Sequence, residues 1–105
     1  MALTNVKVES TQTTRIFLAT GEQAISTMFF CNFSETTDCT IDIYAVPAGS
    51  PVNTSTQIVK ALDLPKTETF VFDLEKLVLS DNDELWAKAT VDKIVVATVS
   101  SISTS

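Results

Sequence analysis

The side chains that could take part in chemistry are mainly hydroxyls and carboxylates. The 105-residue chain has 26 Ser and Thr residues and 13 Asp and Glu residues, but no His. A Ser or Thr nucleophile needs a neighbouring base, and His is the usual one, so nucleophilic catalysis is not expected. A pair of carboxylates acting as acid and base is the remaining catalytic option.

The densest acidic segment is Asp81-Asn82-Asp83-Glu84. It lacks the glycine and the distal glutamate of an EF-hand loop, so a calcium site is only weakly indicated. A polar turn leading into the next strand explains it better, with Asn82 at a positive φ angle. We therefore assign no catalytic, cofactor-binding or metal-binding residue.

Enzyme signatures are absent from the rest of the sequence, which contains no GxSxG, HExxH, CxxC, Walker or dinucleotide-binding motif. The sequence predicts a protein that is not an enzyme and has no cofactor. An enzyme with paired carboxylates stays as a minor alternative.

The charge balance restricts the partners. Seven basic residues stand against thirteen acidic ones, giving a net charge of -6. This argues against binding to nucleic acid or to an anionic membrane, which both need basic patches. No apolar run approaches the ~20 residues of a membrane helix, and the N-terminal segment has no signal-peptide core. We expect a protein made in a cytosol, with no signal peptide or transmembrane segment.

The two cysteines, Cys31 and Cys39, are expected to be buried free thiols, since a reducing compartment disfavours disulfides. A disulfide is the alternative, formed across a hairpin whose turn is residues 34–38. Two glycosylation sequons begin at Asn32 and Asn53. Without a secretory signal, we interpret both as turn chemistry.

Apolar and polar residues alternate with a period of two along most of the chain, which favours strands. Eight strands are expected, over residues 3–9, 13–19, 24–33, 39–46, 57–64, 67–74, 84–91 and 93–102. The last two strands would pair around Asp92, and Pro65 would occupy the first corner of a tight turn. Phe70, Phe72 and Leu74 would face the core, opposite Thr69, Val71 and Asp73.

This strand spacing predicts an all-β fold, a single antiparallel β-sandwich or jelly roll of about eight short strands. One domain would cover residues 1–105. Residues 1–12 would form an N-terminal arm or an edge strand, and residues 103–105 a frayed tail.

One strand pair carries more apolar residues than a solvent-exposed face normally does. If Phe29, Cys31, Phe33, Ile41 and Ile43 face the core, the other face exposes a set of large apolar side chains. Together with Trp86, which is out of phase with its neighbours, these residues form a candidate interface: Met28, Phe30, Tyr44, Val46 and Trp86. Two alternatives stay open, namely that a loop or strand of the same domain covers this face, or that it binds an aromatic ligand.

Two segments resemble small β-sandwich virion proteins of tailed bacteriophages. Residues 24–49 resemble the central hairpin of that family, and residues 58–90 resemble its succession of strands and turns. Leu79, Asp83 and Leu85 match the family's Leu-x-x-Gly-Asp-x-Leu pattern, whereas Asn82 stands where glycine is usual. Lys66 likewise replaces a usual glycine. The resemblance covers roughly residues 13–102 and rests on turns and core positions, none of them catalytic.

The resemblance implies a non-enzymatic structural or assembly protein of a phage particle, of the decoration, fibre or tail-associated type. Such a protein would assemble in the host cytoplasm and reside in the virion. Its partners would be further copies of itself, as a dimer or trimer, or other virion proteins. The alternative function is that of a carbohydrate-binding β-sandwich module on a phage or bacterial surface, with Trp86 and Tyr44 exposed to a glycan.

Overall fold

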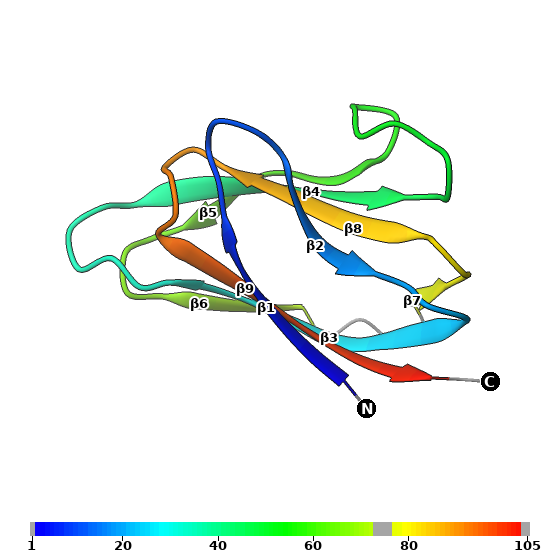
Figure 1. Ribbon diagram of the computed structural model, residues 1–105. Coiled ribbons are helices and arrows are strands. Elements are labelled where there is room, and N and C mark those ends of the chain that lie inside the picture. The colour runs from blue at the N-terminus through cyan, green and yellow to red at the C-terminus, as the bar shows by residue number, and fades with distance from the viewer. Residues whose placement is uncertain (1, 73–76, 104–105) are drawn as a thin grey trace.

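The computed structural model describes residues 2–72 and 77–103, which form two antiparallel β-sheets packed against each other (Figure 1). Its strands are β1 (Ala2–Val8), β2 (Thr14–Leu18), β3 (Gln23–Asn32), β4 (Cys39–Val46), β5 (Gln57–Leu64), β6 (Thr69–Phe72), β7 (Leu77–Leu79), β8 (Glu84–Ala89) and β9 (Val95–Ser103). The first sheet has the order β1-β9-β3-β6, with β7 also paired to β3. The second sheet has the order β2-β8-β4-β5. The predicted all-β sandwich is confirmed, and β7 is a strand that the sequence did not predict.

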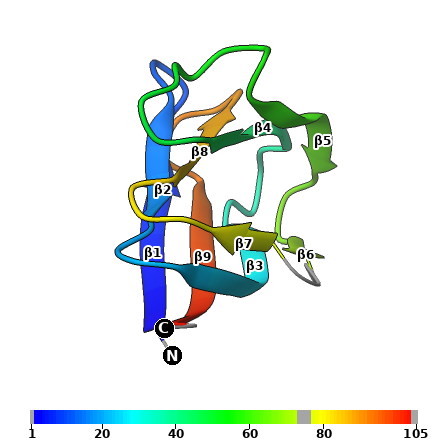
Figure 2. The same cartoon turned by 90° about the vertical axis from the view of Figure 1, so that its right-hand side faces the viewer.

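The strand pairing is that of one long hairpin rolled into two sheets. Along this hairpin β1 pairs with β9, β2 with β8, β3 with β6 and β7, and β4 with β5. Rolling brings β3 beside β9 and β4 beside β8. Because β6 and β7 both lie along the same edge of β3 (Figure 2), they act as one interrupted strand. The result is the two-sheet jelly-roll arrangement.

The long hairpin bends from one sheet to the other three times, and at each bend its two connections are hydrogen-bonded to each other. Ala89 N–H donates to Glu9 O at the first bend, Asn82 N–H to Ala19 O at the second, and Thr67 N–H to Ser34 O at the third. An aspartate assists at every bend. Asp92, Asp81 and Asp38 accept the backbone N–H groups of Ser10, Gly21 and Lys66, respectively. These bonds satisfy N–H groups that have left the sheet ladder.

Asn32 is the polar side chain that connects the two sheets at the third bend. It is completely buried at the end of β3. Its Nδ2 donates to Thr37 O at 2.9 Å and to Leu64 O, at the end of β5, at 3.0 Å. Its Oδ1 accepts the N–H of Ser34 at 3.0 Å. The amide thus joins a strand of the first sheet to a strand of the second, and the turn chemistry predicted at this position is confirmed.

Two predicted pairings are wrong. The strands 24–33 and 39–46 do not form a hairpin, because β3 lies in the first sheet and β4 in the second. The strands on either side of Asp92 are likewise separated, with β8 in the second sheet and β9 in the first. Alternation identifies a strand and its buried face, but it contains no information about which strand lies beside it.

Other local predictions have mixed outcomes. Phe70 and Phe72 pack against the core as predicted, and Phe72 meets Phe30 edge to face with ring centroids 6.1 Å apart. The turn after β5 starts one residue later than predicted, since Glu68 N–H donates to Pro65 O and places Lys66 and Thr67 at the corners. The frayed tail was predicted to begin at Ser103, but Ser103 is the last residue of β9. The predictions for Asp73, Leu74 and residues 104–105 lie outside the described residues.

Replacement of Asn32 should destabilise the fold more than any change in an exposed turn. Asn32→Ala removes three hydrogen bonds and leaves two carbonyls and one N–H without their partner in or near the core. We expect a loss of about 3 kcal/mol in the free energy of unfolding, measured by urea denaturation. Asn53→Ala is the control, because exposed Asn53 makes the same type of turn with Ser55, and its loss should stay below about 1 kcal/mol. Equal losses for the two variants would contradict the role of Asn32.

Candidate interaction surfaces

The outer faces of the two sheets differ in charge. The five strands of the first sheet contain one charged residue, Lys7, and none of the thirteen acidic residues of the chain. The four strands of the second sheet contain six charged residues, Arg15, Asp42, Lys60, Asp63, Glu84 and Lys88. In a chain with a net charge of -6, the nearly uncharged first sheet is the exception.

Several large apolar side chains lie on the outer side of the first sheet, interspersed with uncharged polar residues such as the hydrogen-bonded pair Thr98 and Asn5. We call this surface the apolar face, defined by Leu3, Phe29, Cys31, Phe33, Val71, Val78, Val96 and Ile102. At its centre Phe29 of β3, 37% exposed, lies directly opposite Val71 of β6, 50% exposed. On the other side of β3, Cys31 lies opposite Val96 of β9. Single exposed apolar residues are ordinary, but exposed apolar residues that are neighbours on paired strands, as Phe29 and Val71 are, are typical of an interaction surface.

The single charge of the first sheet lies against an aromatic ring of the same face. Lys7 Nζ is 5.7 Å from the centroid of the Phe33 ring, and that ring is 49% exposed. A cation over an aromatic ring is partly compensated by the ring's negative face. The strands of the first sheet therefore carry no acidic side chain, and their one cationic side chain, that of Lys7, contacts the Phe33 ring of the apolar face.

The predicted interface of Met28, Phe30, Tyr44, Val46 and Trp86 is not assembled on one surface. Met28 and Phe30 are completely buried in the core between the sheets, so their predicted outward direction is wrong. Phe29, Cys31 and Phe33 were expected inside, but they point outward or lie at the surface. An aromatic outer face does exist on this strand, and it is built from the opposite set of residues.

The cause of this inversion lies in the sequence of β3. Large apolar residues occupy both odd and even positions of this strand, so alternation alone does not fix which set is buried. Asn32 has the same phase as Phe30, and a polar residue ordinarily marks the solvent side. Its burial depends on carbonyls of residues 37 and 64, which the local sequence does not reveal.

The remaining three predicted residues belong to the second sheet. Tyr44 and Trp86 are direct cross-strand partners on its outer face and are partly exposed, as predicted. The indole Nε1 of Trp86 donates to Glu84 at 3.1 Å, and Glu84 also accepts from Arg15 at 3.0 Å. Val46, the last residue of β4, is buried but lies outside the core cluster. Its predicted exposure is therefore wrong.

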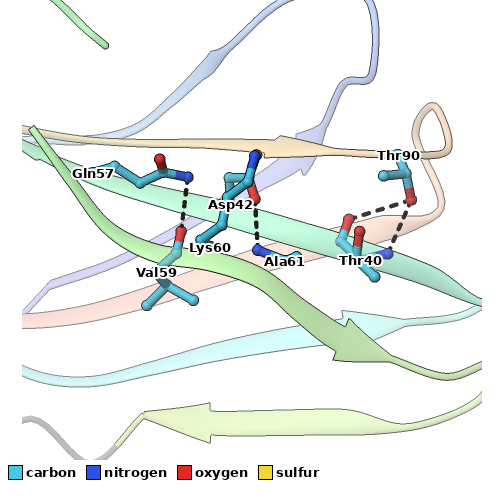
Figure 3. Close-up of polar contacts among 7 residues, drawn as sticks. All are labelled: Thr40, Asp42, Gln57, Val59, Lys60, Ala61 and Thr90. Atoms are coloured by element: carbon cyan, nitrogen blue, oxygen red, sulfur yellow. Dashed lines mark hydrogen bonds and ion pairs between the residues drawn. The ribbon is translucent and has the colours of Figure 1, made fainter. Parts of the chain in front are cut away.

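Polar residues line a hollow of about 310 Å³ on the second sheet, which the sequence did not indicate. Its lining residues come from β4, β8 and the two connections at the first bend: Ser10, Thr40, Asp42, Lys88, Ala89 and Thr90. Asp42 accepts the backbone N–H of Ala61 at 2.8 Å, and Lys60 Nζ lies 3.7 Å from its other oxygen (Figure 3). Asp42 faces Lys88 directly across the β4–β8 pair.

The acidic segment at residues 81–84 forms a turn. Asn82 has a φ of 70°, as predicted. The two carboxylate oxygens of Asp83 accept the N–H groups of Ala48 and Ser80, each at 2.9 Å, and Asp81 accepts that of Gly21. These oxygens serve the backbone of three connections. The described residues contain no group of three potential metal ligands, and no helix among them has the length and hydropathy of a membrane span.

The two free cysteines differ in environment. Cys31 is half-buried on the apolar face, whereas Cys39 is buried at the start of β4. Burial raises the pKa of the Cys39 thiol, and the nearby negative charge of Asp38 raises it further. The free state expected for both thiols agrees with the structure, but the burial expected for Cys31 is only partial.

Alkylation should therefore separate the two thiols. The thiolate is the reactive form, and a raised pKa lowers its fraction at a given pH. In dilute protein at neutral pH, iodoacetamide should modify Cys31 at least about tenfold faster than Cys39, as measured by peptide mass spectrometry. The rate at Cys39 should rise as the pH approaches its raised pKa, and Cys31→Ser should remove the fast phase. Equal rates at the two sites would contradict this assignment.

No protein-family model, curated protein or solved structure matches the chain.

Proposed function

We propose that this protein is a non-enzymatic structural component that self-associates through the apolar face of its first sheet. The observation that carries this proposal is the combination of exposed Phe29, Phe33 and Val71 with a sheet containing one charged residue. Aromatic residues are enriched and charged residues are depleted at the centres of protein interfaces. The apolar face has both properties.

The occupant that best fits this face is a second copy of the chain. Two copies with a net charge of -6 repel each other at long range. An approach through the second sheet would also take the six charged strand residues of each copy out of water, which costs free energy unless each charge finds a partner. An approach through the apolar face brings no strand carboxylates together. A two-fold contact of this kind is self-complementary and closes as a dimer.

Two separate observations suggest the kind of particle to which such a dimer would belong. The sequence of residues 13–102 resembles small virion proteins of tailed bacteriophages, and the jelly-roll arrangement recurs in viral coat proteins. Lectins and cupins share this arrangement, so the topology alone does not select a function. We propose that the dimer is a virion component, assembled in the host cytoplasm and placed where its acidic surface does not face packaged DNA.

Substitution within the apolar face should abolish dimerisation. The double variant Phe29→Glu, Val71→Glu places two carboxylates opposite each other at its centre, and both side chains are already exposed. Size exclusion with light scattering should give twice the chain mass of 11.4 kDa for the natural protein and 11.4 kDa for the variant. Added salt should strengthen the dimer, because it screens the repulsion between two acidic chains.

The matched control is Ile58→Glu, which introduces a carboxylate at a residue of β5 that is 51% exposed. This residue belongs to the second sheet, so the variant should remain a dimer. Circular dichroism should show that all variants keep the fold. A natural protein with a mass of 11.4 kDa at every concentration up to the millimolar range would overturn the proposal, as would a double variant that still dimerises.

A further inference from the structure

The outer face of the second sheet carries three successive pairs of side chains along the adjacent strands β4 and β8. Tyr44 faces Trp86, and Asp42 faces Lys88. The third pair is Thr40 and Thr90. Thr90 N–H donates to Thr40 O, and the Thr90 hydroxyl accepts from Thr40 N–H and donates to Thr40 O (Figure 3). Successive outward positions on a strand are ~7 Å apart, so the three pairs form a strip ~14 Å long. The strip runs from an aromatic pair to the polar hollow.

Several polar groups of the hollow are unused by the fold. The hydroxyls of Ser10 and Thr40 and the ammonium of Lys88 have no hydrogen-bond partner among the described residues. Asp42 is engaged on one oxygen by Ala61 N–H, whereas its other oxygen has only a 3.7 Å ion pair with Lys60. The hollow therefore offers donors from Lys88, an acceptor from Asp42 and hydroxyls that can do either.

The charges of the strip favour a neutral ligand. Asp42 in the hollow and Glu84 beside Trp86 disfavour an anion, and Lys88 with Lys60 disfavours a cation. A ligand that matches adjacent donors and acceptors without a net charge is one rich in hydroxyls. The aromatic pair adds flat apolar surfaces against which the C–H groups of a sugar ring can pack.

We infer that this strip binds a neutral glycan, with one sugar unit in the hollow and a neighbouring unit against Trp86 and Tyr44. Thr40, Asp42 and Lys88 hydrogen-bond the sugar hydroxyls in the hollow. The site lies on the sheet opposite the apolar face, so it stays open in the proposed dimer and does not depend on that dimer. A dimer would present two such sites on its two outer sides.

NMR titration tests this inference. The probes are neutral oligosaccharides of four to six units, drawn from cello-, malto-, xylo-, manno- and chito-series, with oligogalacturonate as the charged comparison. At least one neutral series should give saturable shifts of the backbone amides of residues 40, 42, 88 and 90 and of the Trp86 indole. Trp86 is the only tryptophan in the chain, so its fluorescence reports the same event independently.

Two variants separate the hollow from the rest of the surface. The double variant Thr40→Val, Lys88→Ala removes one unused hydroxyl and the ammonium, and it should weaken binding by at least about tenfold. Thr69→Val is the matched control, because Thr69 is an exposed strand residue of the first sheet with no side-chain partner among the described residues, and its affinity should be unchanged.

Three results would overturn the inference. The first is the absence of saturable shifts at these residues with every neutral probe at about 10 mM, which is ten times a Kd of 1 mM. The second is binding that the double variant leaves unweakened. The third is binding of the oligogalacturonate alone, which would indicate an anion contact at Lys88 instead.

Discussion

The fold depends on what happens to backbone N–H groups where the long hairpin bends between its sheets. A strand satisfies these groups in its ladder, but a connection that crosses from sheet to sheet leaves them without partners. Each of the three bends places two connections side by side, and an aspartate accepts an N–H across the gap. At the third bend the buried amide of Asn32 adds a bond to each side. The rolled hairpin therefore buries its apolar core between the two sheets without the cost of unpaired backbone groups at these bends.

This constraint also distributes the charge of the molecule. Four aspartates lie in the connections, where they accept backbone N–H groups: Asp38, Asp81, Asp83 and Asp92. The acidic residues within strands all belong to the second sheet. Lys7 is the one charged residue in the strands of the first sheet. One side of the sandwich is thereby suited to contact another protein surface, and the other side, with its aromatic pair and polar hollow, is suited to a small hydroxyl-rich ligand.

The sequence was sufficient for eight of the nine strands and for the all-β sandwich class, because period-two alternation and turn residues are local signals. It did not give β7, and two of its strand pairings were wrong. It predicted the polar turn at Asn82 and the outward direction of Trp86 for the same reason. It failed for Met28 and Phe30, since β3 is apolar in both phases and Asn32 is buried only through partners far along the chain. The hollow could not be predicted from the sequence either, because Ser10, Thr40 and Thr90 come together only in the rolled hairpin.

The central claim is that the first sheet, and not the second, meets a second copy of the chain. Methyl NMR with a soluble gadolinium chelate tests it without any substitution, by comparing dilute and concentrated protein. If the first sheet meets a second copy, the methyls of Leu3, Val71 and Ile102 should lose their exposure to the chelate as concentration rises, while those of Ile58 on the second sheet should keep theirs. Protection of Ile58 with continued exposure of Val71, or no change at either, would contradict it.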